Sequence, residues 1–110
     1  MKLKIYVEDR VEEFEIPGQL VEQGEDFFNK MDADLDKGWQ MSHVWVDKPN
    51  QLQRCQIAAD KMMSAIHNEN EKMFMLMGAY ILKNKPGTEE IHLDNTGEIH
   101  TIDFIEKKNA

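Results

Sequence analysis

An apolar stripe with helical spacing runs through the middle of the chain and restricts its fold more than any other feature. Its members recur every three or four residues, and the one charged residue in phase with them is Glu69. In order, the members are Leu52, Cys55, Ala59, Met62, Ile66, Met73, Leu76 and Tyr80. This period belongs to one face of an α-helix, so it predicts a single long helix over residues 50–84, with Asn50 as its N-cap.

A helix of that length is too long for the domain that a chain of 110 residues can form. It would span about 50 Å at roughly 1.5 Å per residue, whereas a compact domain of this size has a radius of gyration of about 13 Å. A second copy of the chain is the expected cover for the surplus apolar surface. We therefore predict a homodimer whose interface contains Leu52, Ala59, Met62, Ile66, Met73, Leu76 and Tyr80.

One alternative to the long helix stays open at Asn68–Asn70. Asparagine has a poor helix propensity, because its side chain competes for backbone hydrogen bonds. A break there would fold the segment back into a helical hairpin, and the stripe would then be ordinary core.

Alternating apolar and polar residues on both sides of this region predict two β-hairpins. In the first, over residues 3–16, a turn centred on Asp9 and Arg10 would place Ile5 opposite Phe14. The second covers residues 89–104 and turns at 94–97, where glycine suits the left-handed position.

A medium amphipathic helix is predicted between the first hairpin and the long helix. It covers about residues 19–37 and is closed by Gly38, and residues 39–46 follow as an extended connector. The predicted fold class is therefore α+β, with the order ββααββ and a four-stranded antiparallel sheet built from the two hairpins. We expect a single domain over residues 1–110, with a frayed tail at 106–110.

The negative charge of the chain is concentrated in its first third. Residues 8–37 hold eleven acidic and three basic residues, so this segment carries the whole net charge of −8. Phosphate contacts need clustered lysine and arginine, so we expect no binding of nucleic acid. The plainest interpretation of the acidic segment is a solvated face that keeps the protein soluble. The sharper interpretation is a docking surface for a basic protein partner.

The sequence contains no stretch that is apolar for long enough to span a membrane. The longest uncharged apolar run, Met73–Leu82, has half of the roughly 20 residues required. Acidic residues also follow the first apolar residues too closely for a signal peptide, so we expect a cytoplasmic protein without membrane partners. Cys55 is the only cysteine, which excludes an intrachain disulfide, and its place in the stripe predicts a buried thiol.

Histidines provide the main candidates for a metal site. In the register that the second turn would set, His92 lies opposite His100, and cross-strand neighbours are about 5 Å apart at Cβ. Two imidazoles are half of a zinc or copper site, so His43 or another ligand would have to complete it. The competing interpretation is a solvent-facing pair without a role.

Three aspartates, Asp32, Asp34 and Asp36, have the spacing of the first ligands of a calcium-binding loop. The glycine that such a loop needs at its sixth position is replaced by Lys37, and the glutamate at its twelfth position by His43. The better interpretation is a helical segment on which Asp32 and Asp36 share one exposed face.

No motif brings together a nucleophile, a base and a group that orients them, and no cofactor is predicted. The leading hypothesis is a small acidic cytoplasmic interaction or regulatory protein, homodimeric through its long helix and without a catalytic motif. Two alternatives remain. One is a metal-binding protein that uses the His92 and His100 pair, and the other is a small enzyme with a pocket near Trp39, His43 and Trp45.

Overall fold

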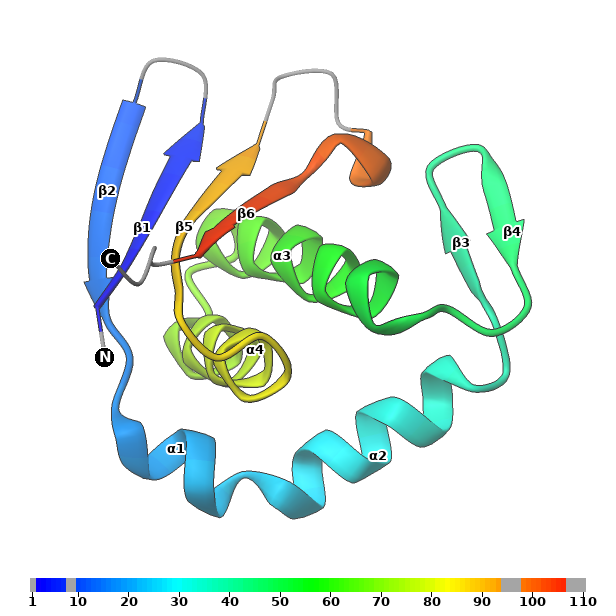
Figure 1. The fold of residues 1–110 in the computed structure, drawn as a ribbon, viewed down its shortest axis with the longest axis horizontal. Coiled ribbons are helices and arrows are strands. Elements are labelled where there is room, and N and C mark those ends of the chain that lie inside the picture. Colours follow the sequence, from blue (N-terminus) through cyan, green and yellow to red (C-terminus); the bar gives the residue numbers. More distant parts are fainter. Residues whose placement is uncertain (1, 8–9, 94–97, 107–110) are drawn as a thin grey trace.

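A four-stranded sheet packs against a pair of helices, and two further helices cover the far side of that pair (Figure 1). The computed structural model describes residues 2–7, 10–93 and 98–106, with the side chain of His100 excepted. Within these residues the elements in chain order are β1 (Lys2–Val7), β2 (Arg10–Glu15), α1 (Gly18–Gln23), α2 (Glu25–Leu35), β3 (Trp39–Met41), β4 (Val44–Val46), α3 (Gln51–His67), α4 (Glu71–Asn84), β5 (Thr88–Leu93), a 3₁₀ turn η1 (Ile99–Thr101) and β6 (Asp103–Glu106).

The main sheet is mixed, with the strand order β2-β1-β5-β6, so the predicted antiparallel sheet is wrong. β1 pairs with β2, and β5 with β6, in antiparallel fashion, but the two central strands β1 and β5 run parallel. Parallel strands need a long crossover connection, and the helical region between β1 and β5 provides one. The chain is α+β, but it does not have the predicted ββααββ order, because β3 and β4 form a second, two-stranded sheet where a connector was expected.

The register of the first hairpin differs from the predicted one by two residues. Leu3 is paired with Phe14 and Ile5 with Glu12, instead of Ile5 with Phe14. A shift of two residues keeps every side chain on its original face of the sheet, so alternation alone cannot distinguish the two registers. Of the first predicted turn, Asp9 lies outside the described residues and Arg10 belongs to β2. Residues 94–97 of the second turn and 107–110 of the predicted tail also lie outside the described residues, whereas Glu106 belongs to β6.

The predicted long helix is wrong, because α3 ends at His67 and α4 begins at Glu71. The backbone amide of Asn70 donates to the Ala65 carbonyl and that of Glu69 to the Ile66 carbonyl. With Glu69 in the left-handed region at φ 55°, this is the Schellman arrangement that ends many helices. Asn70 then accepts a hydrogen bond from the Met73 amide and caps α4. α3 and α4 therefore form the helical hairpin that a break at Asn68–Asn70 would produce, which was the alternative to one long helix.

The predicted helix over 19–37 is divided into α1 and α2 at Gly24. A Cβ atom there would lie 2.7 Å from both the Leu20 carbonyl oxygen and the Phe28 ring, so the close approach at this bend requires glycine. α3 does begin at the predicted cap, since the Asn50 side chain accepts from the Gln53 amide and Gln53 accepts from the Asn50 amide, both at 2.8 Å.

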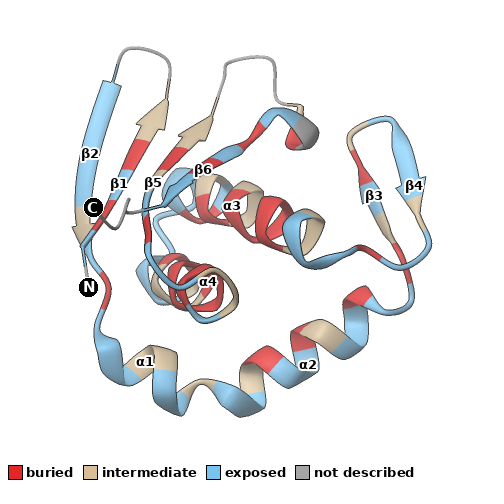
Figure 2. Ribbon diagram, in the orientation of Figure 1, coloured by how far each residue is buried: buried red, intermediate tan, exposed pale blue. Residues whose placement is uncertain are grey.

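The core lies on both sides of the α3–α4 hairpin, between it and the sheet and between it and α2 (Figure 2). Buried residues occupy α3, α4 and the inward faces of β1 and β5, whereas α1 and α2 expose most of their surface. The Cys55 thiol is fully buried, and this burial raises its pKa to about 12. Among the described residues, no helix is long and apolar enough to cross a membrane.

Candidate functional site

The main sheet does not pair the two histidines that were predicted to face each other across a hairpin. In the sheet register His92 is opposite Asp103, and residue 100 belongs to η1, so the predicted cross-strand pairing of His92 with His100 is wrong. The His92 ring stacks on Tyr6 with centroids 4.5 Å apart, and its Nε2 lies 2.9 Å from Glu90 Oε1. The side chain of His100 lies outside the described residues. In the described part of the chain, no three His, Cys, Asp or Glu side chains are grouped as a metal site.

The residues proposed for an enzyme pocket point to different surroundings. The His43 side chain is 91% exposed, and its Nε2 lies 3.7 Å from Glu98 Oε1. The Trp45 ring covers Gly38, and its Nε1–H donates to Asp47 at 2.9 Å. Trp39 lines a hollow with residues of α2, α3 and α4, and neither His43 nor Trp45 is among the described residues that line it. The structure therefore does not bring Trp39, His43 and Trp45 together.

The seven residues predicted as a dimer interface are divided between core and surface. Ala59, Met62 and Tyr80 are buried in their own chain, and Met73 and Leu76 are half-buried. Leu52 and Ile66 remain exposed, at 46% and 38%, but they lie near opposite ends of α3. Most of the stripe is thus covered by the chain itself, and Leu52 and Ile66 are the exposed part of the predicted dimer interface.

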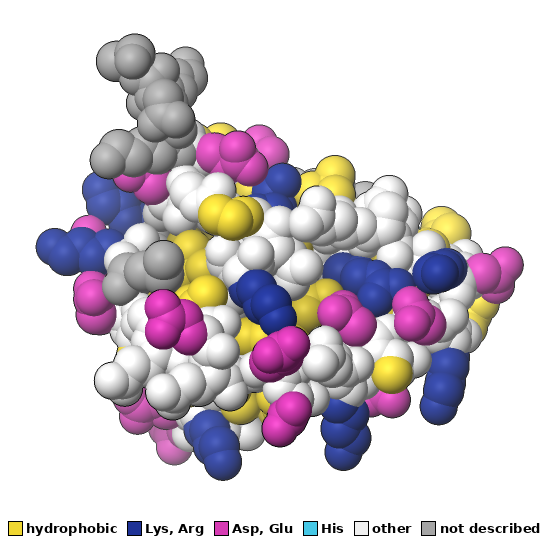
Figure 3. Space-filling model, turned by 60° about the horizontal axis from the view of Figure 1, so that its bottom comes forward, with side chains coloured by type: hydrophobic (Ala, Val, Ile, Leu, Met, Phe, Trp, Pro, Cys, Tyr) yellow, Lys and Arg dark blue, Asp and Glu magenta, His cyan; other side chains and the backbone are white. Residues whose placement is uncertain are grey.

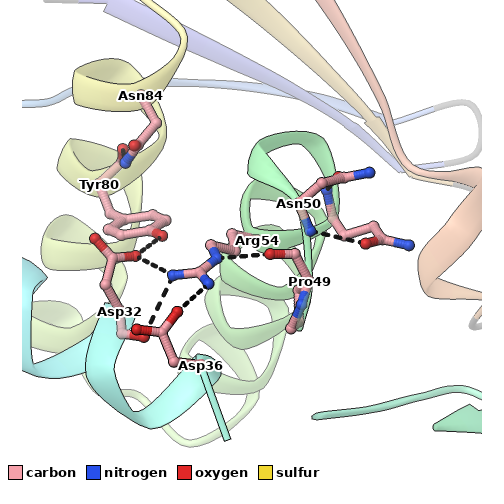
Figure 4. A network of polar contacts seen from close by, with 8 residues as sticks. Asp32, Asp36, Pro49, Asn50, Arg54, Tyr80 and Asn84 are labelled. Carbon is pink, nitrogen blue, oxygen red and sulfur yellow. Dashed lines mark hydrogen bonds and ion pairs between the residues drawn. The ribbon is translucent and has the colours of Figure 1, made fainter. Parts of the chain in front are cut away.

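A polar network joins α2 to α3 and α4 (Figure 4). The Arg54 guanidinium donates to the Pro49 carbonyl at 2.8 Å and to Asp32 Oδ1 at 3.1 Å, and it also binds the Asp36 carboxylate. The Tyr80 hydroxyl donates to Asp32 Oδ1 at 2.6 Å. Asp32 and Asp36 do share one face, as predicted from their spacing. Both carboxylates on that face bind the Arg54 guanidinium and do not form a metal-ion site.

The pKa values in this network follow from its contacts. Burial, and then the hydrogen bond to the Asp32 carboxylate, raise the pKa of Tyr80. The hydrogen bond from Arg54 lowers the pKa of Asp36. The Arg54 side chain is only 14% exposed and is engaged by all of these partners, so the network acts as a structural clamp and offers no reactive group.

A more promising surface lies at the edge of the main sheet, along β2. β2 is the outermost strand, and the described residues place no strand beyond it (Figure 1). Its inward-facing side chains Arg10, Glu12 and Phe14 overhang a hollow of about 250 Å³, whose floor includes Met63 and Ile66 of α3. The sheet therefore extends past its helical support at this edge and leaves apolar surface open.

A second hollow, of about 350 Å³, continues from the first toward the α3–α4 turn. The two hollows share Phe14 and Ile66, and the second is also lined by Phe74 and by two carboxylates, Glu69 and Glu71. We refer to the two together as the β2 groove. The Phe14 ring packs against Phe74 with centroids 4.5 Å apart, which makes the groove floor continuous.

The charge around the β2 groove is predominantly negative. Glu12 lies on β2, Glu69 in the turn and Glu71 at the start of α4. Among the described residues, Arg10 is the only arginine or lysine that lines either hollow. On the opposite face of β2, Glu13 is contacted by Lys2 at 3.8 Å. Of the groove carboxylates, only Glu12 belongs to the acidic segment 8–37. The groove itself was not predictable from the sequence, because it depends on the helix break at Glu69.

Comparison of the chain with protein families, curated proteins and solved structures finds no match. Any function proposed for this chain therefore rests on the surfaces described above.

Proposed function

We propose that this protein is an interaction module that binds a basic, extended segment of a partner protein along β2. The observation that carries the proposal is an open sheet edge above an apolar groove rimmed by carboxylates. The interaction role and the basic partner are those expected from the sequence. The proposed contact surface, however, is β2 and not a long helix. A cytoplasmic location remains a prediction.

Strand addition suits the geometry of this edge. A partner strand beside β2 would form main-chain hydrogen bonds with its outer edge, which provides affinity without regard to sequence. Alternate side chains of that strand would face the helix layer, because side chains along a strand point to opposite faces in turn. Those side chains would meet Phe14 and Ile66, so small apolar residues fit every second position.

The acidic side chains favour a basic partner over a second copy of β2. Three of the six residues of β2 are glutamates, at 12, 13 and 15. Antiparallel pairing of β2 with itself would bring glutamates near glutamates, and like charges across strands are destabilising. In a strand with lysine or arginine between apolar residues, the apolar side chains would face the groove and the basic side chains would lie on the opposite face, beside Glu13.

The proposal is tested with a fluorescein-labelled heptapeptide of alternating lysine and valine, by fluorescence anisotropy. We expect saturable binding that weakens as salt is raised, because the charge contacts are exposed to solvent. A heptapeptide of alternating glutamate and valine should not bind. A lysine–valine peptide with proline at its central position should bind at least about tenfold more weakly, because proline cannot donate to a strand ladder.

Charge reversal then locates the contact. The double variant Glu12→Lys and Glu13→Lys should weaken binding by about tenfold or more, and the peptide should shift the amide NMR signals of residues 10–15 in the unsubstituted protein. The matched control Glu22→Lys with Glu89→Lys changes the net charge equally at exposed positions away from the groove. Equal weakening by both double variants, or equal binding of the proline peptide, would mean nonspecific attraction and would overturn the proposal.

A further inference from the structure

A separate cleft lies between α2 and α4. Figure 3, in which the bottom of the view in Figure 1 comes forward, shows hydrophobic side chains between lysine or arginine and acidic side chains. The cleft has a volume of about 290 Å³. Its apolar lining includes three methionines, Met31, Met73 and Met77, and two aromatic rings, Phe27 and Trp39.

This lining fits a flat aromatic group. Methionine side chains adapt to irregular shapes, and their sulfur atoms make favourable contacts with aromatic rings. Phe27 and Trp39 can add offset or edge-to-face ring contacts. The volume is at the lower end of the range for small-molecule pockets, which is about 300–1,000 Å³. A ligand of one or two rings therefore suits the cleft better than a long chain or a nucleotide.

More basic than acidic residues line the cleft, whereas the whole chain is acidic. Lys30 and Lys61 line it together with one acid, Asp34, whereas the full chain carries a net charge of −8. The Lys61 ammonium lies 4.5 Å from the centroid of the Trp39 ring. Among the described residues, neither lysine is within ion-pair distance of a carboxylate. The cleft is thus lined by two lysines whose ammonium groups form no ion pair with a described carboxylate, and the rest of its lining is mainly apolar.

We propose that this cleft binds a small aromatic monocarboxylate. The ring would lie among the methionines, Phe27 and Trp39, and the carboxylate would accept hydrogen bonds from Lys30 and Lys61. A single negative charge is favoured over a phosphate dianion, because Asp34 lines the same cleft and would repel the second charge. This site is independent of the β2 groove, since the two share no lining residue.

The test uses 2-naphthoate, with uncharged 2-naphthamide as its matched isostere, in isothermal titration calorimetry. Charge-assisted hydrogen bonds should make naphthoate bind at least about tenfold more tightly than naphthamide. Trp39 reports the location of binding. The chain has two tryptophans, so the variant Trp45→Phe leaves Trp39 as the only one, and its emission should change on titration.

Substitutions at the rim distinguish recognition from simple apolar binding. Lys30→Met and Lys61→Met should each weaken naphthoate binding about three- to tenfold, and Lys61→Arg should restore most of it by keeping the charge. Asp34→Asn should strengthen naphthoate binding and leave naphthamide binding unchanged, an effect that loss of folding cannot produce. Lys72→Met, on α4 but outside the cleft, should have no effect.

Three results would overturn this inference. One is equal affinity for naphthoate and naphthamide, which would remove the role of the lysines. The second is binding in calorimetry without any change in Trp39 emission, which would place the ligand elsewhere. The third is absence of naphthoate binding by a folded protein. None of these outcomes bears on peptide binding at β2.

Discussion

The carboxylates of Asp36 and Asp60 lie in surroundings that shift their pKa values in opposite directions. The hydrogen bond from Arg54 lowers the pKa of Asp36, whereas burial raises the pKa of Asp60. Asp36 therefore contributes stability that is present above the ordinary aspartate pKa and is lost as the pH falls through its lower folded pKa. Asp60 is protonated more readily in the folded state, so the protein loses stability as the pH rises from the ordinary aspartate pKa through the higher folded pKa of Asp60.

From these signs we expect opposite effects of two isosteric substitutions at neutral pH. Asp60→Asn should raise the free energy of unfolding, because it removes a half-buried charge, and Asp36→Asn should lower it. Both differences should shrink as the pH falls and each carboxylate becomes protonated. Urea unfolding at neutral pH and near pH 3 measures them. Effects of the same sign at neutral pH would contradict the assigned environments.

Cys55 provides a second prediction at the scale of one residue. Its thiol is buried and becomes accessible to a reagent only when the core opens. Its pKa of about 12 also leaves almost no thiolate at pH 8. Iodoacetamide should therefore leave the folded protein unmodified for hours at pH 8 and alkylate it readily in urea, as followed by mass spectrometry. Rapid alkylation without denaturant would show that the packing of α3 around Cys55 is open.

At the scale of elements, the turn between α3 and α4 concentrates strain at Glu69. Its φ of 55° is normally adopted by glycine at this position of a Schellman motif. Glu69→Gly should therefore stabilise the protein by about 1 kcal/mol in urea unfolding. Because Glu69 lines the β2 groove, the same substitution should weaken binding of the lysine–valine peptide.

Ser42 is a matched control for Glu69, since its φ is 54°. Its hydroxyl accepts a hydrogen bond from the Ile99 amide at 2.9 Å, which ties the β3–β4 hairpin to η1. Ser42→Gly relieves the same backbone strain but removes that acceptor, at a cost of about 1 kcal/mol. We expect no net gain in stability. A stabilised Ser42→Gly together with an unchanged Glu69→Gly would contradict this account of the turn.

The same turn explains which elements could be predicted from the sequence. The capping signal at Asn50 is local, so the start of α3 was predictable. The helix end at Glu69 lacks the usual glycine, and the apolar stripe continues in phase across it, so periodicity predicted one helix. The predicted β1–β2 register was wrong for a similar reason, because a shift of two residues preserves the pattern of buried side chains.

At the scale of the whole molecule, the folded chain covers the apolar surface that first suggested a dimer. Its radius of gyration is 13.3 Å and its extents are 35 × 35 × 33 Å, which leaves no projecting rod. The acidic first third was evident from composition, but the groove and the cleft were not. Each is lined by segments far apart in the sequence, such as β2 with α3 or α2 with α4, and no local pattern specifies that contact.

This change alters the expected oligomeric state. With Ala59, Met62 and Tyr80 buried in their own chain, the stripe no longer needs a partner, and we expect a monomer of 12.9 kDa in sedimentation equilibrium at micromolar concentration. Leu52→Lys and Ile66→Lys change the exposed members of the stripe and serve as controls. A species of twice that mass, dissociated by both substitutions, would instead restore the interface predicted from the sequence. A dimer unaffected by either would have to use another surface, since both ends of α3 would be excluded.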